Sequence, residues 1–124
     1  MTILEIINRV DTIKPNSYTQ TEKIDWLSTL DGIIKNEIID TYEGSEAIVF
    51  EGYTPDTSLD TVLLVPAPYD DIYIRWLESR IDYANGEYNK YNNSATAYNA
   101  AFEAYSRYYN THHKPKHTVK RFIF

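Results

Sequence analysis

Apolar residues at steps of three and four along the first third of the chain predict two amphipathic helices. The first covers residues 2–11, and the Pro-Asn-Ser sequence at 15–17 interrupts the pattern after it. Thr19 and Glu22 have the spacing of a capping box, so the second helix should begin there and continue to Tyr42. The predicted buried positions are Ile3, Ile6, Ile7 and Val10 in the first helix and Ile24, Leu27, Leu30, Ile34 and Ile38 in the second.

The region from Pro66 to Pro115 has the pattern of a helical hairpin with a tyrosine-rich seam. Nine of the twelve tyrosines lie between these prolines. We expect the turn at residues 92–94 (Asn-Asn-Ser), with Ser94 as the N-cap of the second helix. The predicted seam consists of Tyr73, Leu77, Ile81, Ala84, Tyr88 and Tyr91 on the first helix and Tyr98, Phe102, Tyr105 and Tyr109 on the second. This core spacing favours packing of the tyrosines over base stacking on a single strand.

Gly44 ends the second helix in this prediction, and the character of the chain then changes. Residues 47–50 (Ala-Ile-Val-Phe) and 62–65 (Val-Leu-Leu-Val) are short apolar runs typical of strands, with turn-forming residues between them. We therefore expect a short β ribbon at about residues 46–65. The pattern leaves two interpretations open, an ordered loop pinned by its apolar side chains and a projecting loop that contacts a neighbouring subunit.

Charge divides the chain into a body and a tail. Residues 1–110 contain 8 basic and 18 acidic side chains, a formal charge of −10, whereas residues 111–124 carry +4. Since Pro115 should end the preceding helix, we expect a helical domain at 1–110 and an extended basic C-terminal arm at 111–124. The acidity of the body keeps a small domain soluble. As the wall of a conduit, it would also let DNA slide without sticking.

The arm ends in Phe122, Ile123 and Phe124, and apolar side chains at a chain end need cover. The cover is either the chain's own core or another protein, and we favour an acidic neighbour because the body of every other copy is acidic. Trp26 and Trp76 lie one residue off the apolar stripes, where they either border the core or face a neighbour. The candidate partner-interface residues are Trp26, Trp76, Lys114, Lys116, Lys120, Arg121, Phe122 and Phe124.

Residue types that support catalysis lack the spacing that known motifs need. The chain has no cysteine, and it contains no nucleophile elbow, P-loop or dinucleotide-binding motif. His112, His113 and His117 lie among lysines without a fourth ligand, so we expect a solvated histidine tail and no metal site. Paired acids such as Asp70 and Asp71 suit a helix N-terminus. We therefore predict no enzymatic activity and no cofactor.

Length and hydropathy predict a single soluble domain. The 124 residues suffice for one core, and a hydrophobic content of 43% argues against disorder. No apolar run approaches the roughly 20 residues of a transmembrane helix, and the N-terminus lacks the pattern of a secretion signal. We expect a mainly α fold, a small bundle of about four helices, that acts in a cytoplasm or in a particle assembled there without contacting a membrane.

Two segments resemble the small head–tail connector (adaptor) proteins of tailed bacteriophages and their prophage relatives. Residues 65–105 read VPAPYDDIYIRWLESRIDYANGEYNKYNNSATAYNAAFEAY, and residues 3–34 read ILEIINRVDTIKPNSYTQTEKIDWLSTLDGII in support. The resemblance implies a mainly helical subunit that docks on the portal ring at the capsid vertex. It implies many copies in a ring that DNA passes through, and it transfers no catalytic residue.

On this resemblance we expect a structural subunit of the virion neck, made in the cytoplasm of a bacterial host. Its expected partners are the portal protein, other neck and tail-completion proteins and further copies of itself, in contacts that join one face of a copy to a different face of the next. DNA would pass without sequence-specific binding. The alternative is a small non-enzymatic regulatory or DNA-associated module of a prophage, which strong, salt-dependent binding of duplex DNA would favour.

Overall fold

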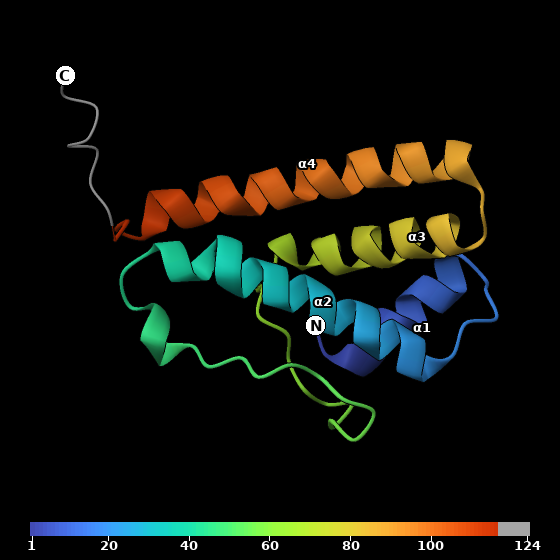
Figure 1. Cartoon of the computed structure of the whole chain (residues 1–124), viewed down its shortest axis with the longest axis horizontal. Coiled ribbons are helices and arrows are strands. Elements are labelled where there is room, and N and C mark those ends of the chain that lie inside the picture. The colour runs from blue at the N-terminus through green and yellow to red at the C-terminus, as the bar shows by residue number, and fades with distance from the viewer. Residues whose placement is uncertain (117–124) are drawn as a thin grey trace.

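The chain folds into a bundle of four helices, as a computed structural model shows for residues 1–116 (Figure 1). The helices are α1 (Ile3–Ile13), α2 (Gln20–Glu37), α3 (Ile72–Ala84) and α4 (Tyr88–His112), with 3₁₀ turns at Ile39–Thr41, Ser45–Ala47 and Tyr69–Asp71. The central helix α3 contacts the other three, and α4 runs beside it in the opposite direction. The predicted mainly α bundle is therefore confirmed. Within residues 1–116 no helix is long and apolar enough to cross a membrane.

Both N-terminal helices begin at side-chain caps. Thr19 and Glu22 form the predicted capping box of α2, and Thr2 and Glu5 form the same arrangement at α1. The core positions predicted for these helices are all buried: Ile3, Ile6, Ile7, Val10, Ile24, Leu27, Leu30, Ile34 and Ile38. The α2 helix ends earlier than the predicted Tyr42, because the chain tightens into the 3₁₀ turn after Glu37.

The turn between α3 and α4 lies at residues 85–87, so the prediction of a turn at 92–94 is wrong. Gly86 has a φ of +73°, a conformation that glycine adopts without steric cost. The Asn-Asn-Ser sequence lies inside α4, where the Ser94 hydroxyl donates to the backbone carbonyls of Lys90 and Tyr91. Ser94 is therefore not an N-cap.

The seam between α3 and α4 keeps only part of the predicted set. Tyr73, Leu77 and Ile81 are buried on α3, and Tyr105 and Tyr109 are buried on α4. Tyr98 and Phe102 are partly buried against the core. Tyr88 is 62% exposed, because the earlier turn moves it to the first residue of α4. The tyrosines on this seam therefore serve packing, as predicted.

The predicted β ribbon is absent from residues 1–116, which contain only isolated bridges between Thr2 and Val62 and between Tyr42 and Pro115. Thr61, next to the second apolar run, pairs with the start of α1: the amide of Ile3 donates to the carbonyl of Thr61 at 3.0 Å. The first turn of a helix has unpaired N–H groups, and this pairing satisfies one of them. The segment is therefore a long ordered loop.

Candidate interaction surfaces

Asp31, on α2, holds the long loop between α2 and α3 against the bundle. Its buried carboxylate accepts hydrogen bonds from the Tyr53 hydroxyl at 2.5 Å, the Tyr73 hydroxyl at 2.7 Å and the Leu64 amide at 3.2 Å. The Tyr73 hydroxyl in turn accepts from the Val65 amide at 2.7 Å. Because its donors come from the loop itself and from α3, the carboxylate fixes the loop and offers no open position to a substrate.

Burial governs the protonation of this cluster. Desolvation raises the pKa of Asp31, and the hydrogen bonds from Tyr53 and Tyr73 oppose that rise. Burial and the nearby Asp31 carboxylate raise the pKa of both tyrosines as well. The sequence analysis missed this cluster. Its signal is an acidic residue four positions after Leu27, on the buried face of the predicted helix.

Residues 43–62, termed here the acidic loop, expose both carboxylates and apolar side chains. The sequence contains no lysine or arginine between Lys35 and Arg75. Val49 and Val62 are 75% and 68% exposed. Much of this loop lies on the side of α2 that faces away from α4 (Figure 1). The exposed carboxylates, none of them in an ion pair within residues 1–116, belong to Glu43, Glu46, Glu51, Asp56 and Asp60.

The base of the basic arm is bonded to the end of the bundle. The Glu43 amide donates to the Lys114 carbonyl at 2.8 Å, and the Lys116 amide donates to the Thr41 carbonyl at 3.0 Å. The pairing is antiparallel and is centred on Pro115. We term this pairing of residues 41–43 with residues 114–116 the clamp. Both lysines of the clamp are exposed, and neither is in an ion pair within residues 1–116. The predicted start of an extended arm at residue 111 is wrong, because α4 continues to His112.

Aromatic contacts stiffen the clamp. The His113 ring stacks on Tyr109 with a centroid distance of 3.7 Å, and the Tyr42 ring lies 5.2 Å from that of Tyr109. The Tyr42 hydroxyl donates to the side chain of Asn110 at 2.8 Å. His113 is thus partly buried, unlike the solvated histidine that the sequence predicted, because the clamp folds it back onto α4. His117 lies outside the described residues.

Trp26 and Trp76 lie together at the border of the core. The Trp76 indole N–H donates to the Trp26 carbonyl at 2.7 Å, and its ring lies 4.9 Å from that of Tyr98. Trp76 is buried and Trp26 is partly exposed. By helical rise, Trp26 lies roughly 20 Å along α2 from the clamp, so the structure does not bring the tryptophans and the arm together. The other candidates, Lys120, Arg121, Phe122 and Phe124, lie outside the described residues.

Arg80 is enclosed by aromatic rings near the α3–α4 turn. Its guanidinium carbon lies 4.6 Å from the ring centre of Trp76, 5.5 Å from that of Tyr83 and 5.7 Å from that of Tyr91. The Nε atom is buried and has no hydrogen-bond partner within residues 1–116. Cation–π attraction to these rings therefore stabilises the guanidinium group in place of an ion pair with a carboxylate. The cluster joins the two helices of the hairpin.

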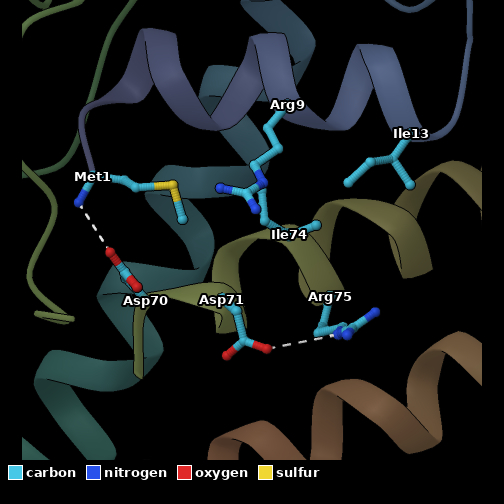
Figure 2. Close-up of a pocket in the computed structure, with 7 residues that line it drawn as sticks. All are labelled: Met1, Arg9, Ile13, Asp70, Asp71, Ile74 and Arg75. Carbon is cyan, nitrogen blue, oxygen red and sulfur yellow. Dashed lines mark hydrogen bonds and ion pairs between the residues drawn. The ribbon is translucent and has the colours of Figure 1, made fainter. Parts of the chain in front are cut away.

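A hollow of about 260 Å³ lies between α1 and the start of α3 (Figure 2). Its charged groups are largely compensated, because the Met1 amino group lies 3.3 Å from Asp70 and Arg75 lies 3.8 Å from Asp71. Its lining includes no serine, cysteine or histidine side chain. Its lining residues are Met1, Arg9, Ile13, Asp70, Asp71, Ile74 and Arg75.

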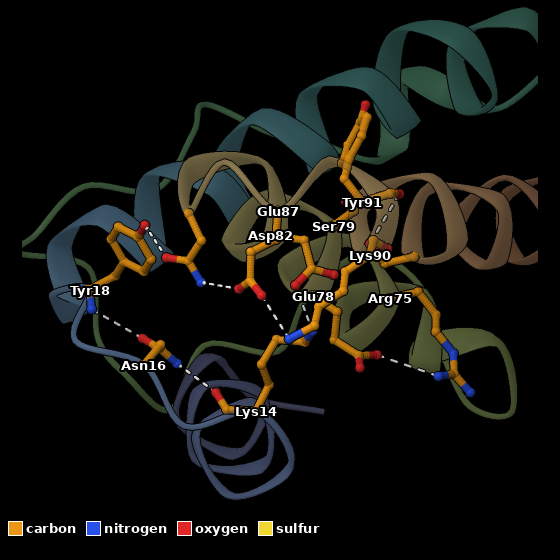
Figure 3. Close-up of polar contacts among 12 residues, drawn as sticks. Lys14, Asn16, Tyr18, Arg75, Glu78, Ser79, Asp82, Glu87, Lys90 and Tyr91 are labelled. Atoms are coloured by element: carbon orange, nitrogen blue, oxygen red, sulfur yellow. Dashed lines mark hydrogen bonds and ion pairs between the residues drawn. The ribbon is translucent and has the colours of Figure 1, made fainter.

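A polar network ties the α3–α4 turn to the connection between α1 and α2 (Figure 3). Lys14 Nζ lies 2.6 Å from the buried Asp82 carboxylate. The Tyr18 hydroxyl donates to Asn85 at 2.6 Å, and Asn85 donates to Glu87 at 3.2 Å. Because the buried carboxylate is paired, this network is structural.

The described part of the chain holds no group of three or more His, Cys, Asp or Glu side chains that could bind a metal ion. Comparisons with protein-family models, with curated proteins and with solved structures found no match. The resemblance to connector proteins therefore depends on the quoted residues alone, and the function that it implies is a proposal.

Proposed function

We propose that the chain is a structural subunit of a bacteriophage head–tail connector. It docks on the portal ring in the virion neck, and its copies form a ring that DNA passes through. The observation that supports an assembly role most is the clamp, which anchors a basic arm at one end of an acidic helical body. A segment that is already anchored at its base loses less conformational entropy on docking than a free one does.

The polar clusters of the bundle also support a non-enzymatic role. The buried carboxylates of Asp31 and Asp82 are both occupied by groups of the chain, the first by hydroxyl and amide donors and the second by Lys14. Fully partnered polar groups rigidify a fold, whereas a catalytic group must have a face open to substrate. The acidic surface suits a channel wall because it repels the phosphates of passing DNA.

The decisive experiment is co-sedimentation with the portal ring encoded by the same genome. We expect saturable binding of the full chain, and weaker binding of a chain that ends at Lys116, which keeps the clamp but loses the rest of the arm. Absence of binding by the full chain would contradict portal docking. Circular dichroism of both forms controls for loss of the helical fold.

The basic arm is the one observation that favours the second candidate, a non-enzymatic regulatory or DNA-associated module of a prophage. Four cations in fourteen residues could contact phosphates, although the acidic body opposes this. A titration with duplex DNA at several salt concentrations separates the two functions. Tight binding that weakens steeply with salt indicates the module, whereas weak binding at all salt concentrations indicates the connector.

A further inference from the structure

We propose that the acidic loop of one copy binds the C-terminal arm, residues 114–124, of the next copy. The inference uses the proposed function only in assuming that several copies assemble. It assigns the contact between copies to two different surfaces, the loop and the arm. A contact of this kind is heterologous, so each copy both donates an arm and receives one.

The acidic loop has the properties of a docking surface. Two valines are largely exposed on it, and its five carboxylates have no cationic partner within residues 1–116. Hydrogen bonds to Asp31 from Tyr53, inside the loop, and from Leu64, just after it, tie the loop to α2. A surface that is already ordered loses little entropy when it binds a partner.

The arm matches this surface in charge and in hydrophobicity. Residues 114–124 contain four cations and no acid, and they end in an apolar run. The acids would attract the lysines and the arginine, while the exposed valines would meet phenylalanine and isoleucine side chains. Such complementarity favours this pairing over pairing between two acidic bodies, in which like charges oppose one another.

The direction of the chain in the clamp favours binding of the arm to a different copy. Its pairing is antiparallel: Lys114 bonds to Glu43, and two residues later Lys116 bonds to Thr41. At Lys116 the chain is therefore directed back toward the end of α2 and away from Gly44, where its own acidic loop continues. Eight further residues span at most about 28 Å when extended, which is enough to reach an adjacent subunit.

Cysteine cross-linking tests the contact, because the natural chain contains no cysteine. An affinity-tagged full chain with V49C is mixed with an untagged full chain with K120C. A short bismaleimide is then added to one sample of the free chains and to a second sample that was incubated with portal rings. We expect a tagged–untagged dimer. The matched control replaces V49C by N99C, an exposed position on α4, and should give at least roughly tenfold less product.

Two results would overturn the inference. One is equal product from the V49C and N99C chains, which would mean that the arm has no preference for the loop. The other is closure of a V49C/K120C double variant within one chain at every dilution, which would assign the loop to the arm of the same copy.

Charge reversal provides an independent test of direct contact. The loop variant E46K/E51K and the arm variant K116E/R121E, each with the cross-linking cysteines V49C and K120C, should each lose roughly tenfold in cross-linking when alone. Mixing the two variants should restore the product, because each arm again meets a loop of opposite charge. A mixture that does not recover the cross-linked product would overturn the inference. The variant E103K on α4 is the control for a change in net charge.

The outcome is separable from that of the proposed function. Cross-linking through the loop without portal binding would support the loop–arm contact and contradict portal docking. Portal binding without loop-specific cross-linking would support docking and contradict the contact.

Discussion

Asp31 shows how one buried residue organises a loop of this protein. Three donors from outside its own helix converge on its carboxylate, and two of them come from the long loop, at Tyr53 and Leu64. A buried acceptor of this kind is costly to desolvate, and its hydrogen bonds offset that cost only while all partners are in place. Substitutions at this cluster should therefore affect stability strongly.

Replacing Asp31 by asparagine should lower the free energy of unfolding by about 2–3 kcal/mol, because an amide N–H₂ would face hydroxyl and amide donors. Tyr53→Phe removes one donor and leaves the carboxylate its other two, so it should cost about 1 kcal/mol. Urea unfolding followed by circular dichroism measures both values. A larger loss for Tyr53→Phe than for Asp31→Asn would contradict this account.

The raised pKa of Asp31 also predicts a pH dependence. Between the usual value of 3.8 and the raised value, the folded chain binds more protons at this site than the unfolded chain does. Its contribution to stability therefore increases as pH falls through that window. The difference in unfolding free energy between the natural chain and Asp31→Asn should grow as pH is lowered, since other groups titrate in both. A difference that does not vary with pH would refute the assignment.

Among the elements, the α3–α4 hairpin depends on its turn and on the aromatic contacts beside it. Gly86 allows the backbone to reverse at a positive φ, and Arg80 then lies between rings of α3 and α4. The turn and the packing are mutually consistent, because moving the turn would move Tyr91 away from Arg80.

Two glycine substitutions should have opposite effects on the bundle. Gly86→Ala introduces a side chain at a φ of +73° and should destabilise by about 1 kcal/mol, although no atom lies within 4 Å of the added Cβ. Gly32→Ala lies inside α2, where the new Cβ would be 3.9 Å from Phe50, an ordinary contact. It should stabilise by up to about 1 kcal/mol. Thermal melting measures the change in stability of each variant. A change of the same sign in both variants would contradict the structure.

For the whole molecule, the distribution of charge and the position of the clamp set the possible modes of assembly. The acidic loop faces away from α4, whereas the clamp joins the ends of α2 and α4 (Figure 1). The two meet at Glu43, but most of the loop lies away from the clamp, so copies that join arm to loop contact each other through different surfaces, head to tail. Such contacts close into rings when the rotation between copies allows it.

Shortening the arm should separate its structural part from its assembly part. A chain that ends at Lys116 keeps both backbone bonds of the clamp and should melt like the full chain. A chain that ends at His113 loses those bonds and should be less stable by about 1–2 kcal/mol. Both short chains should assemble less well than the full chain. Calorimetry and sedimentation measure the two effects, and equal melting temperatures for the two short chains would show that the clamp does not stabilise the fold.

The amino-acid sequence by itself determined the presence of the helices, the capping box of α2 and the division of charge. These features depend on neighbours within about four residues, as in the apolar stripe of Ile24, Leu27 and Leu30 or the capping box of Thr19. Local spacing is sufficient to predict them because each helix forms its hydrogen bonds within itself. The net charge of residues 111–124 follows from composition alone.

Only the tertiary structure decided the turn, the loop and the clamp. Both Asn85-Gly86 and residues 92–94 have turn chemistry, and packing of Arg80 and the aromatic rings selects the first. Leu59 and Thr61, just before the strand-like run at 62–65, pair with α1 because the unpaired amides of Leu4 and Ile3 lie there. Asp31 and the clamp join residues that are distant in sequence, and no local pattern specifies such partners.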